Sequence, residues 1–231
     1  ANGDAVKNIT DFRLFNGSSF ESIALVNMPF EASGDNATHT KDYSTYSQNG
    51  TISTAIFSTT GGFDDFGAYE FTGAANQRIT IISFEKGPLL SMSLWVNFDS
   101  TAGGYQNLVG DGEAALDFNW MLYKVTGAAT LRPHVQTTGG ITSFDSATTL
   151  STNTWHHVVQ TSNGSHLRLY INSVEDANSP ATYSGTPLNT NNRMFIGDDL
   201  RGGDVLDGFI DEVRIYNRTL SSAQVLALYN T

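Results

Sequence analysis

Apolar and polar residues alternate in many short runs of this chain, and such runs predict β-strands with one face on a core. Every second residue of Ser91–Phe98 is apolar, and Leu167–Asn172 shows the same period of two. The Asn163-Gly164 pair that separates this run from Trp155–Thr161 predicts a hairpin. Further strands are expected at Ala24–Phe30, Gly67–Phe71, Ile79–Phe84, Tyr105–Val109, Phe118–Val125, Thr130–Gln136, Arg193–Ile196 and Gly208–Tyr216.

Only the C-terminal residues carry the pattern of a helix. Ser221 followed three residues later by Gln224 fits a capping box, and Val225, Leu228 and Tyr229 then follow at helical spacing. Ten or more strands with one short terminal helix predict an all-β fold, an antiparallel two-sheet β-sandwich of the jelly-roll type. We expect one domain over residues 23–231, preceded by an extension or extra strand over residues 1–22.

The amino-acid composition excludes several classes of protein function. Charged residues are 15% of the 231 residues, against about 25% in an ordinary domain, and the net charge is −11. This acidic balance argues against partners that are nucleic acids or anionic membranes. The chain has no cysteine, which excludes thiol catalysis and cysteine zinc sites. No apolar run approaches the roughly 18 residues of a membrane span, so no membrane insertion is expected.

Two stretches resemble a known family. Trp155–Asn172 resembles a hairpin of laminin G-like, concanavalin A-like jelly rolls, and Asp207–Ser221 resembles the last strand of that family. The likeness extends from Ile23 to Tyr229 and implies the lectin-glucanase jelly roll. Because this scaffold hosts lectins, adhesion modules and enzymes, function has to be argued from sites. Supporting likenesses are Leu25–Glu31, Asp42–Thr51 and Ser93–Val96.

Asp211 is the most informative acidic residue. It shares strand parity with Val213 and Ile215, and an ionised carboxylate on an apolar face is costly unless it is paired or bound to a metal. The resemblance implies a structural Ca²⁺ between the last strand and early loops, where Glu31 and Asp42 match the acidic positions of the family. We expect calcium bound by some of Glu31, Asp42 and Asp211, with backbone carbonyls completing the site.

The alternative for these residues is a carboxylate capped by backbone N–H groups or by an arginine, without a metal. Two other acidic loops, Gly197–Asp207 and Gly61–Asp65, could each form a further calcium site or the rim of a ligand site. A solvated acidic loop is the favoured interpretation of both.

Four residues are candidates for a sugar-binding surface: Tyr105, Trp120, Tyr123 and His134. Aromatic faces pack on the C–H faces of pyranose rings, and Tyr105 and Trp120 do not match core positions of the family, unlike Trp95 and Trp155. The alternative for each is ordinary packing in the sandwich.

The chain shows none of the paired-carboxylate motifs of glycosidases on this scaffold, and no nucleophile elbow. We therefore expect a non-catalytic, extracellular or cell-surface binding module, a carbohydrate-binding or adhesion domain of a larger protein. Its expected partner is a glycan or a surface protein, with neighbouring domains of the same chain as further contacts. The alternatives are an assembly subunit of a surface layer, filament or virion, and a polysaccharide hydrolase or lyase.

Overall fold

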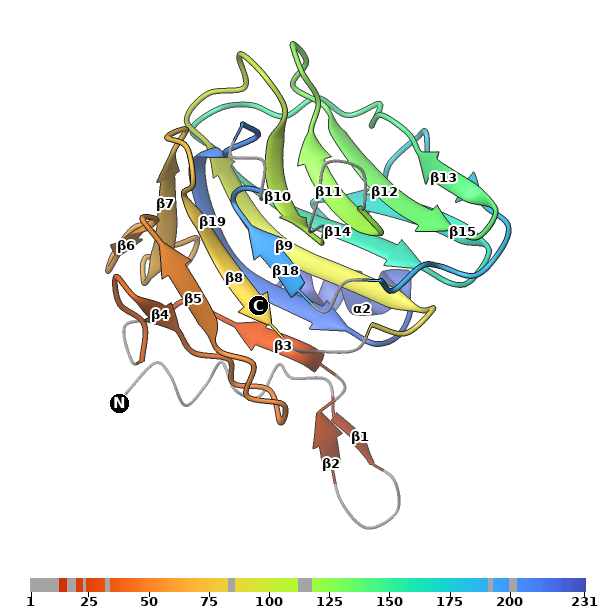
Figure 1. Ribbon diagram of the computed structural model, residues 1–231, viewed down its shortest axis with the longest axis horizontal. Coiled ribbons are helices and arrows are strands. Elements are labelled where there is room, and N and C mark those ends of the chain that lie inside the picture. The colour runs from red at the N-terminus through yellow and green to blue at the C-terminus, as the bar shows by residue number, and fades with distance from the viewer. Residues whose placement is uncertain are drawn as a thin grey trace.

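The computed structural model is a sandwich of two antiparallel β-sheets (Figure 1). It describes residues 13–15, 20–22, 24–31, 34–82, 86–111, 118–190, 193–199 and 203–231. The first sheet has eight strands in the order β13-β12-β11-β10-β18-β8-β5-β4. Their bounds are β4 His39–Thr40, β5 Gly50–Ser53, β8 Arg78–Ile82, β10 Gln106–Gly110, β11 Trp120–Lys124, β12 Leu131–Thr137, β13 Gly140–Ser143 and β18 Arg193–Ile196.

The second sheet has nine strands, seven of them in the order β16-β15-β14-β9-β19-β7-β6, while β17 pairs with β15 and β3 pairs with β19. All the expected strands are present, within two residues of their expected ends, and residues 83–84 of the strand expected at Ile79–Phe84 lie outside the described residues. The bounds are β3 Ala24–Met28, β6 Ile56–Ser58, β7 Ala68–Thr72, β9 Leu90–Phe98, β14 Trp155–Ser162, β15 His166–Ile171, β16 Val174–Glu175, β17 Ala181–Thr182 and β19 Asp207–Tyr216.

The core lies between the two sheets and follows from the period of two. In β9, Leu94, Val96 and Phe98 are fully buried in the main apolar cluster. The hairpin expected at Asn163-Gly164 joins β14 and β15 in antiparallel register, and Gly164 adopts φ +88°, which suits glycine.

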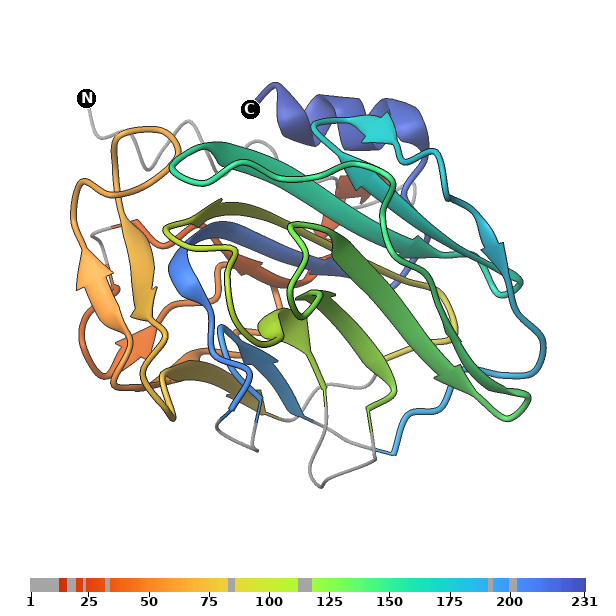
Figure 2. The same ribbon diagram turned by 90° about the horizontal axis from the view of Figure 1, so that it is seen from above.

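The outer face of the nine-stranded sheet carries a second apolar cluster beneath α2 (Ser222–Tyr229), which lies outside the two sheets in Figure 2. Ser221 and Gln224 form the expected capping box, and Val225 and Leu228 are buried against the sheet. Trp95 belongs to this outer layer: its ring stacks on Phe63 at 3.4 Å between centroids. The family resemblance had suggested packing between the sheets for Trp95.

A β-bulge in β19 changes which face Asp211 occupies. Glu212 has φ +53°, and the register against β9 shifts between Asp211 and Arg214. Asp211 is opposite Trp95 on the outer face of the sheet, whereas Val213 after the bulge is in the core. The expectation that Asp211 shares the apolar face was wrong because strict alternation does not continue through a bulge.

The backbone of β1 (Arg13–Phe15) and β2 (Phe20–Ser22) forms a separate two-stranded pair that projects from the sandwich in Figure 1. The rest of the expected extension over residues 1–22 lies outside the described residues, as do residues 200–202 of the acidic loop. Among the described residues, no helix has the length and apolar character of a membrane span.

Candidate functional site

Three of the four expected sugar-contact residues line one cavity on the outer face of the eight-stranded sheet. The cavity has a volume of about 190 Å³ and lies over β10, β11 and β12. Neighbouring strands bring the residues together, since Asn107 is opposite Tyr123 and Met121 is opposite His134. The described residues that line it are Tyr105, Asn107, Phe118, Met121, Tyr123, His134 and Asp204.

Two tyrosines form the aromatic wall of this cavity. Tyr105 and Tyr123 meet edge to face, with 5.6 Å between ring centroids. Tyr105 is 40% exposed, so its ring is available to a ligand. The Arg132 guanidinium lies 5.9 Å from the Tyr123 ring centroid and forms an ion pair with Asp145. Burial raises the pKa of Tyr123, so its hydroxyl remains protonated at neutral pH.

Two of the residues that line the cavity, Asn107 and His134, have polar side chains that are almost fully buried. Asn107 is 1% exposed and donates from Nδ2 to the Asp198 carbonyl at 3.0 Å, while its buried Oδ1 has no hydrogen-bond partner among the described residues. Nε2 of His134 lies 3.0 Å from the Phe118 carbonyl oxygen, which can only accept. Burial lowers the pKa of His134, so the ring is neutral with its proton on Nε2, and Nδ1 is the acceptor.

Trp120 does not line this cavity, although it was expected with the others. It is 1% exposed and lies in the core between the sheets. Trp120 and Met121 are neighbours in β11 and therefore point to opposite faces. Asn107 had not been singled out from the sequence, because an asparagine is typical of a turn or strand edge and its burial depends on the strands around it.

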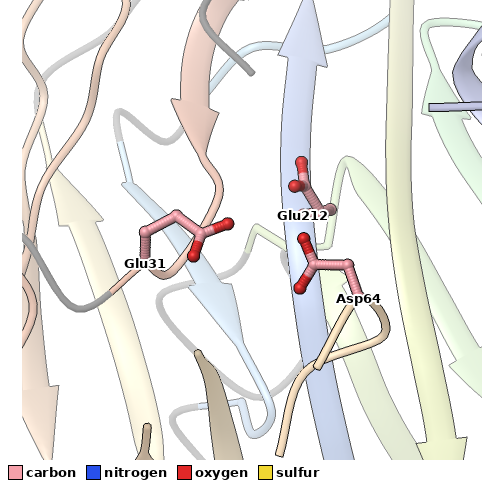
Figure 3. Close-up of side chains that lie close together, drawn as sticks. All are labelled: Glu31, Asp64 and Glu212. Atoms are coloured by element: carbon pink, nitrogen blue, oxygen red, sulfur yellow. The ribbon is translucent and has the colours of Figure 1, made fainter. Parts of the chain in front are cut away.

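A second site is a cluster of three carboxylates from distant parts of the chain. Glu31 follows β3, Asp64 lies in the loop between β6 and β7, and Glu212 is the bulge residue of β19. One oxygen from each lies within 4.8 Å of the others, and Figure 3 shows the carboxylates facing a common space. Glu31 and Glu212 are buried. Three hard oxygen donors in this arrangement fit the chemistry of Ca²⁺.

Asp211 positions this cluster. Its Oδ2 accepts from the Phe63 N–H at 3.0 Å and its Oδ1 from the Glu212 N–H at 2.7 Å. Phe63 also stacks on Trp95, so the loop that carries Asp64 is fixed by a hydrogen bond and a ring contact. Asp211 thus lies beside the cluster and orders both its loop and its bulge.

Arg214 places one positive charge next to the cluster. It forms an ion pair with Glu212, and its Nε lies 3.3 Å from Asn27 Oδ1. An arginine was the alternative partner expected for Glu31, Asp42 and Asp211, and in the structure Arg214 pairs with Glu212, the neighbour of Asp211.

Asp42, expected as a calcium ligand, lies apart from this cluster. Its carboxylate accepts hydrogen bonds from the backbone of Asn27, Ser44 and Gln48 at 2.7–2.9 Å and from the Ser44 hydroxyl at 2.6 Å. Four protein donors fill both oxygens, which corresponds to the capped alternative.

Two residues of the cluster were not predicted as ligands from the sequence. Asp64 belongs to the acidic loop Gly61–Asp65, and Glu212 is adjacent to Asp211, but no sequence pattern indicated that these two residues lie close together.

A family model described as the concanavalin A-like lectin/glucanases superfamily, Laminin_G_3, matches residues 71–226. The chain belongs to this superfamily. No curated protein matches its sequence.

Solved structures with the same fold share little sequence with this superfamily member. The botulinum neurotoxin serotype D ligand-binding domain, in complex with N-acetylneuraminic acid, has a TM-score of 0.66 at 14% identity over 90% of this chain and 50% of its own. Trypanosoma rangeli sialidase has a TM-score of 0.69 at 14% sequence identity, and the match covers 98% of this chain and 37% of the sialidase. The binding domain of Paraclostridial Mosquitocidal Protein 1 has a TM-score of 0.60 at 18% sequence identity, and the match covers 90% of this chain and 52% of that domain. The chain thus spans about half or less of each structure.

Proposed function

We propose that this protein is a non-catalytic carbohydrate-binding module, located outside the cell or on its surface, and that the cavity at Tyr105, Tyr123 and His134 is its sugar site. The observation that carries the proposal is the aromatic cavity itself, in which the 40% exposed Tyr105 ring meets Tyr123 edge to face beside the polar lining residues Asn107 and His134. Sialic acid in the serotype D structure supports a glycan ligand.

The charges of the cavity favour an uncharged sugar. Asn107 and the neutral His134 ring carry no charge, and His134 Nδ1 can accept a hydrogen bond, which suits the hydroxyl and amide N–H donors of neutral hexoses and N-acetylhexosamines. No lysine or arginine is among the described residues that line the cavity, and nearby Arg132 is paired with Asp145. Among the described lining residues, a sialic acid or uronic acid carboxylate would therefore have no cationic partner.

Asp204 is the only described lining residue with a carboxylate, whereas glycoside hydrolysis uses two. This supports binding over catalysis.

A glycan array followed by calorimetry tests the proposal. Neutral glycans are expected to bind, and Tyr105→Ala should weaken binding about fivefold or more, since stacking of a ligand ring on an aromatic side chain contributes on the order of 1–3 kcal/mol. Tyr46→Ala is the matched control, because Tyr46 is 52% exposed and does not line the cavity. Equal loss in both variants, or preferential binding of sialylated glycans, contradicts the assignment.

We also propose that Glu31, Asp64 and Glu212 bind a structural Ca²⁺. The support is the proximity of their oxygens, which are the hard donors that Ca²⁺ prefers. Such an ion would link β3, the β6–β7 loop and β19, which are far apart in the sequence.

A further inference from the structure

Lys86 and Asp111 form an ion pair that is fully buried. Lys86 Nζ lies 3.1 Å from Asp111 Oδ2, and both side chains are 0% exposed. Lys86 follows β8 and Asp111 follows β10. Both strands are antiparallel to β18, which lies between them, so their C-terminal ends lie at the same end of the sheet. Two ionised groups without access to water are costly to bury, and neither sugar binding nor the acidic cluster uses this pair.

The surroundings of the Asp111 carboxyl resemble those of an acyl group prepared for attack. Its Oδ1 accepts from the backbone N–H groups of Asn119 at 2.8 Å and Trp120 at 2.6 Å. Two backbone donors on one oxygen stabilise the negative charge that this atom acquires when a nucleophile adds to the carbon. The other oxygen, Oδ2, faces Lys86 Nζ and lies 3.3 Å from Asn119 Nδ2.

Burial raises the pKa of Asp111, against the opposing effect of Lys86. The shift favours the carboxylic acid, which is the electrophilic form, and a proton passing from Nζ to Oδ2 also leaves lysine as a free amine. Both reactive forms thus arise from one proton transfer inside the pair.

We propose that Lys86 and Asp111 condense to an intramolecular isopeptide bond that joins the ends of β8 and β10. After the proton transfer, the Nζ lone pair adds to Cγ, and the negative charge forms on Oδ1 between the N–H groups of Asn119 and Trp120. A proton then moves from Nζ to Oδ2, the Cγ–Oδ2 bond breaks, and one water molecule leaves. The product is a neutral amide, and no oxidant, reductant or co-reactant is consumed.

Intact-mass spectrometry of the denatured full chain, followed by tryptic mapping, tests the bond. The chain is expected to be lighter by one water molecule than its sequence. Trypsin does not cleave after an amidated lysine, so residues 79–124 should appear as one peptide that also lacks one water. Lys86→Arg keeps a buried cation without a nucleophilic amine, and its mass should equal that of its sequence. Lys124 is an internal control, because it is also buried but donates to the Thr101 carbonyl, and cleavage after it should be complete.

Two results overturn the proposal. A full sequence mass, with separate peptides 79–86 and 87–124, shows a plain ion pair. A missing water with normal cleavage after Lys86 shows dehydration within the Asp111-Gly112 backbone instead. Both readouts come from the unmodified protein, so the test does not depend on whether Lys86→Arg folds.

Discussion

Asp35 shows how a single buried carboxyl makes stability depend on pH. It is 7% exposed, and its Oδ1 accepts from the Thr40 hydroxyl and the Lys41 N–H, whereas Oδ2 is buried without a partner among the described residues. Burial raises the pKa of Asp35 to about 6, above the ordinary 3.8. The folded state therefore holds a proton that the unfolded chain releases between these two values, and stability falls as the pH rises through that window.

Asp35→Asn is expected to flatten this dependence. Asparagine keeps the Oδ1 acceptor and cannot ionise, so the free energy of unfolding between pH 4 and 6.5 should fall less steeply than in the unchanged protein. The difference scales with about 1.4 kcal/mol per unit of pKa separation. Urea unfolding at several pH values measures it. Asp198, whose pKa burial also raises to about 6, keeps part of the slope in the variant. A parallel pair of curves would show that Asp35 is not the group that titrates.

At the scale of elements, the bulge in β19 and the loop between β6 and β7 depend on each other. Asp211 binds Phe63 in the loop, and the bulge places Glu212 beside Asp64 of the same loop. The loop approaches Asp211 so closely that a Cβ on Gly62 would lie 2.5 Å from the Gly67 carbonyl oxygen and 2.9 Å from Asp211 Oδ2. The close approach, more than backbone freedom, requires glycine here.

Gly62→Ala is therefore expected to displace the loop and lower the free energy of unfolding by about 1–3 kcal/mol, the usual cost of overpacking. Gly104→Ala is the matched control, since a Cβ there would meet nothing within 4 Å. Thermal unfolding of both variants checks the prediction. A loop that tolerates alanine at Gly62 as well as Gly104 does would contradict the geometry of Asp211.

At the scale of the whole molecule, the carboxylate cluster links segments that are 181 residues apart at most, from Glu31 to Glu212. Ca²⁺ bound only by the folded state stabilises it by mass action, about 2.7 kcal/mol at 100 times the dissociation constant. Calcium should therefore raise the Tm, and EDTA should lower it.

Glu212→Gln should remove most of this calcium-dependent shift. Asp145→Asn serves as the control, because Asp145 pairs with Arg132 outside the cluster and the substitution likewise removes one negative charge. Differential scanning calorimetry with and without calcium measures the shift. A Tm of the unchanged protein that does not respond to calcium or EDTA would contradict the metal proposal.

The fold follows closely from local patterns. The period-two runs predicted the long strands of both sheets, and Ser221 with Gln224 predicted where the helix begins. Both signals depend only on residues that are neighbours along the chain. Strands such as β4, β6 and β16, with two or three residues each, went unpredicted. Such segments are too short to show a period, and they are held in the sheet by their partners.

The sequence by itself determined the sandwich, its family and the aromatic residues Tyr105 and Tyr123 of the candidate sugar site. Only the tertiary structure placed Trp120 in the core and capped the Asp42 carboxylate with hydrogen-bond donors of the protein. It also brought Glu31, Asp64 and Glu212 together. The reason is physical: alternation and capping are local, whereas a bulge, a buried acceptor or a cluster of charges depends on which distant strands become neighbours. The pairing of Lys86 with Asp111 is of this second kind.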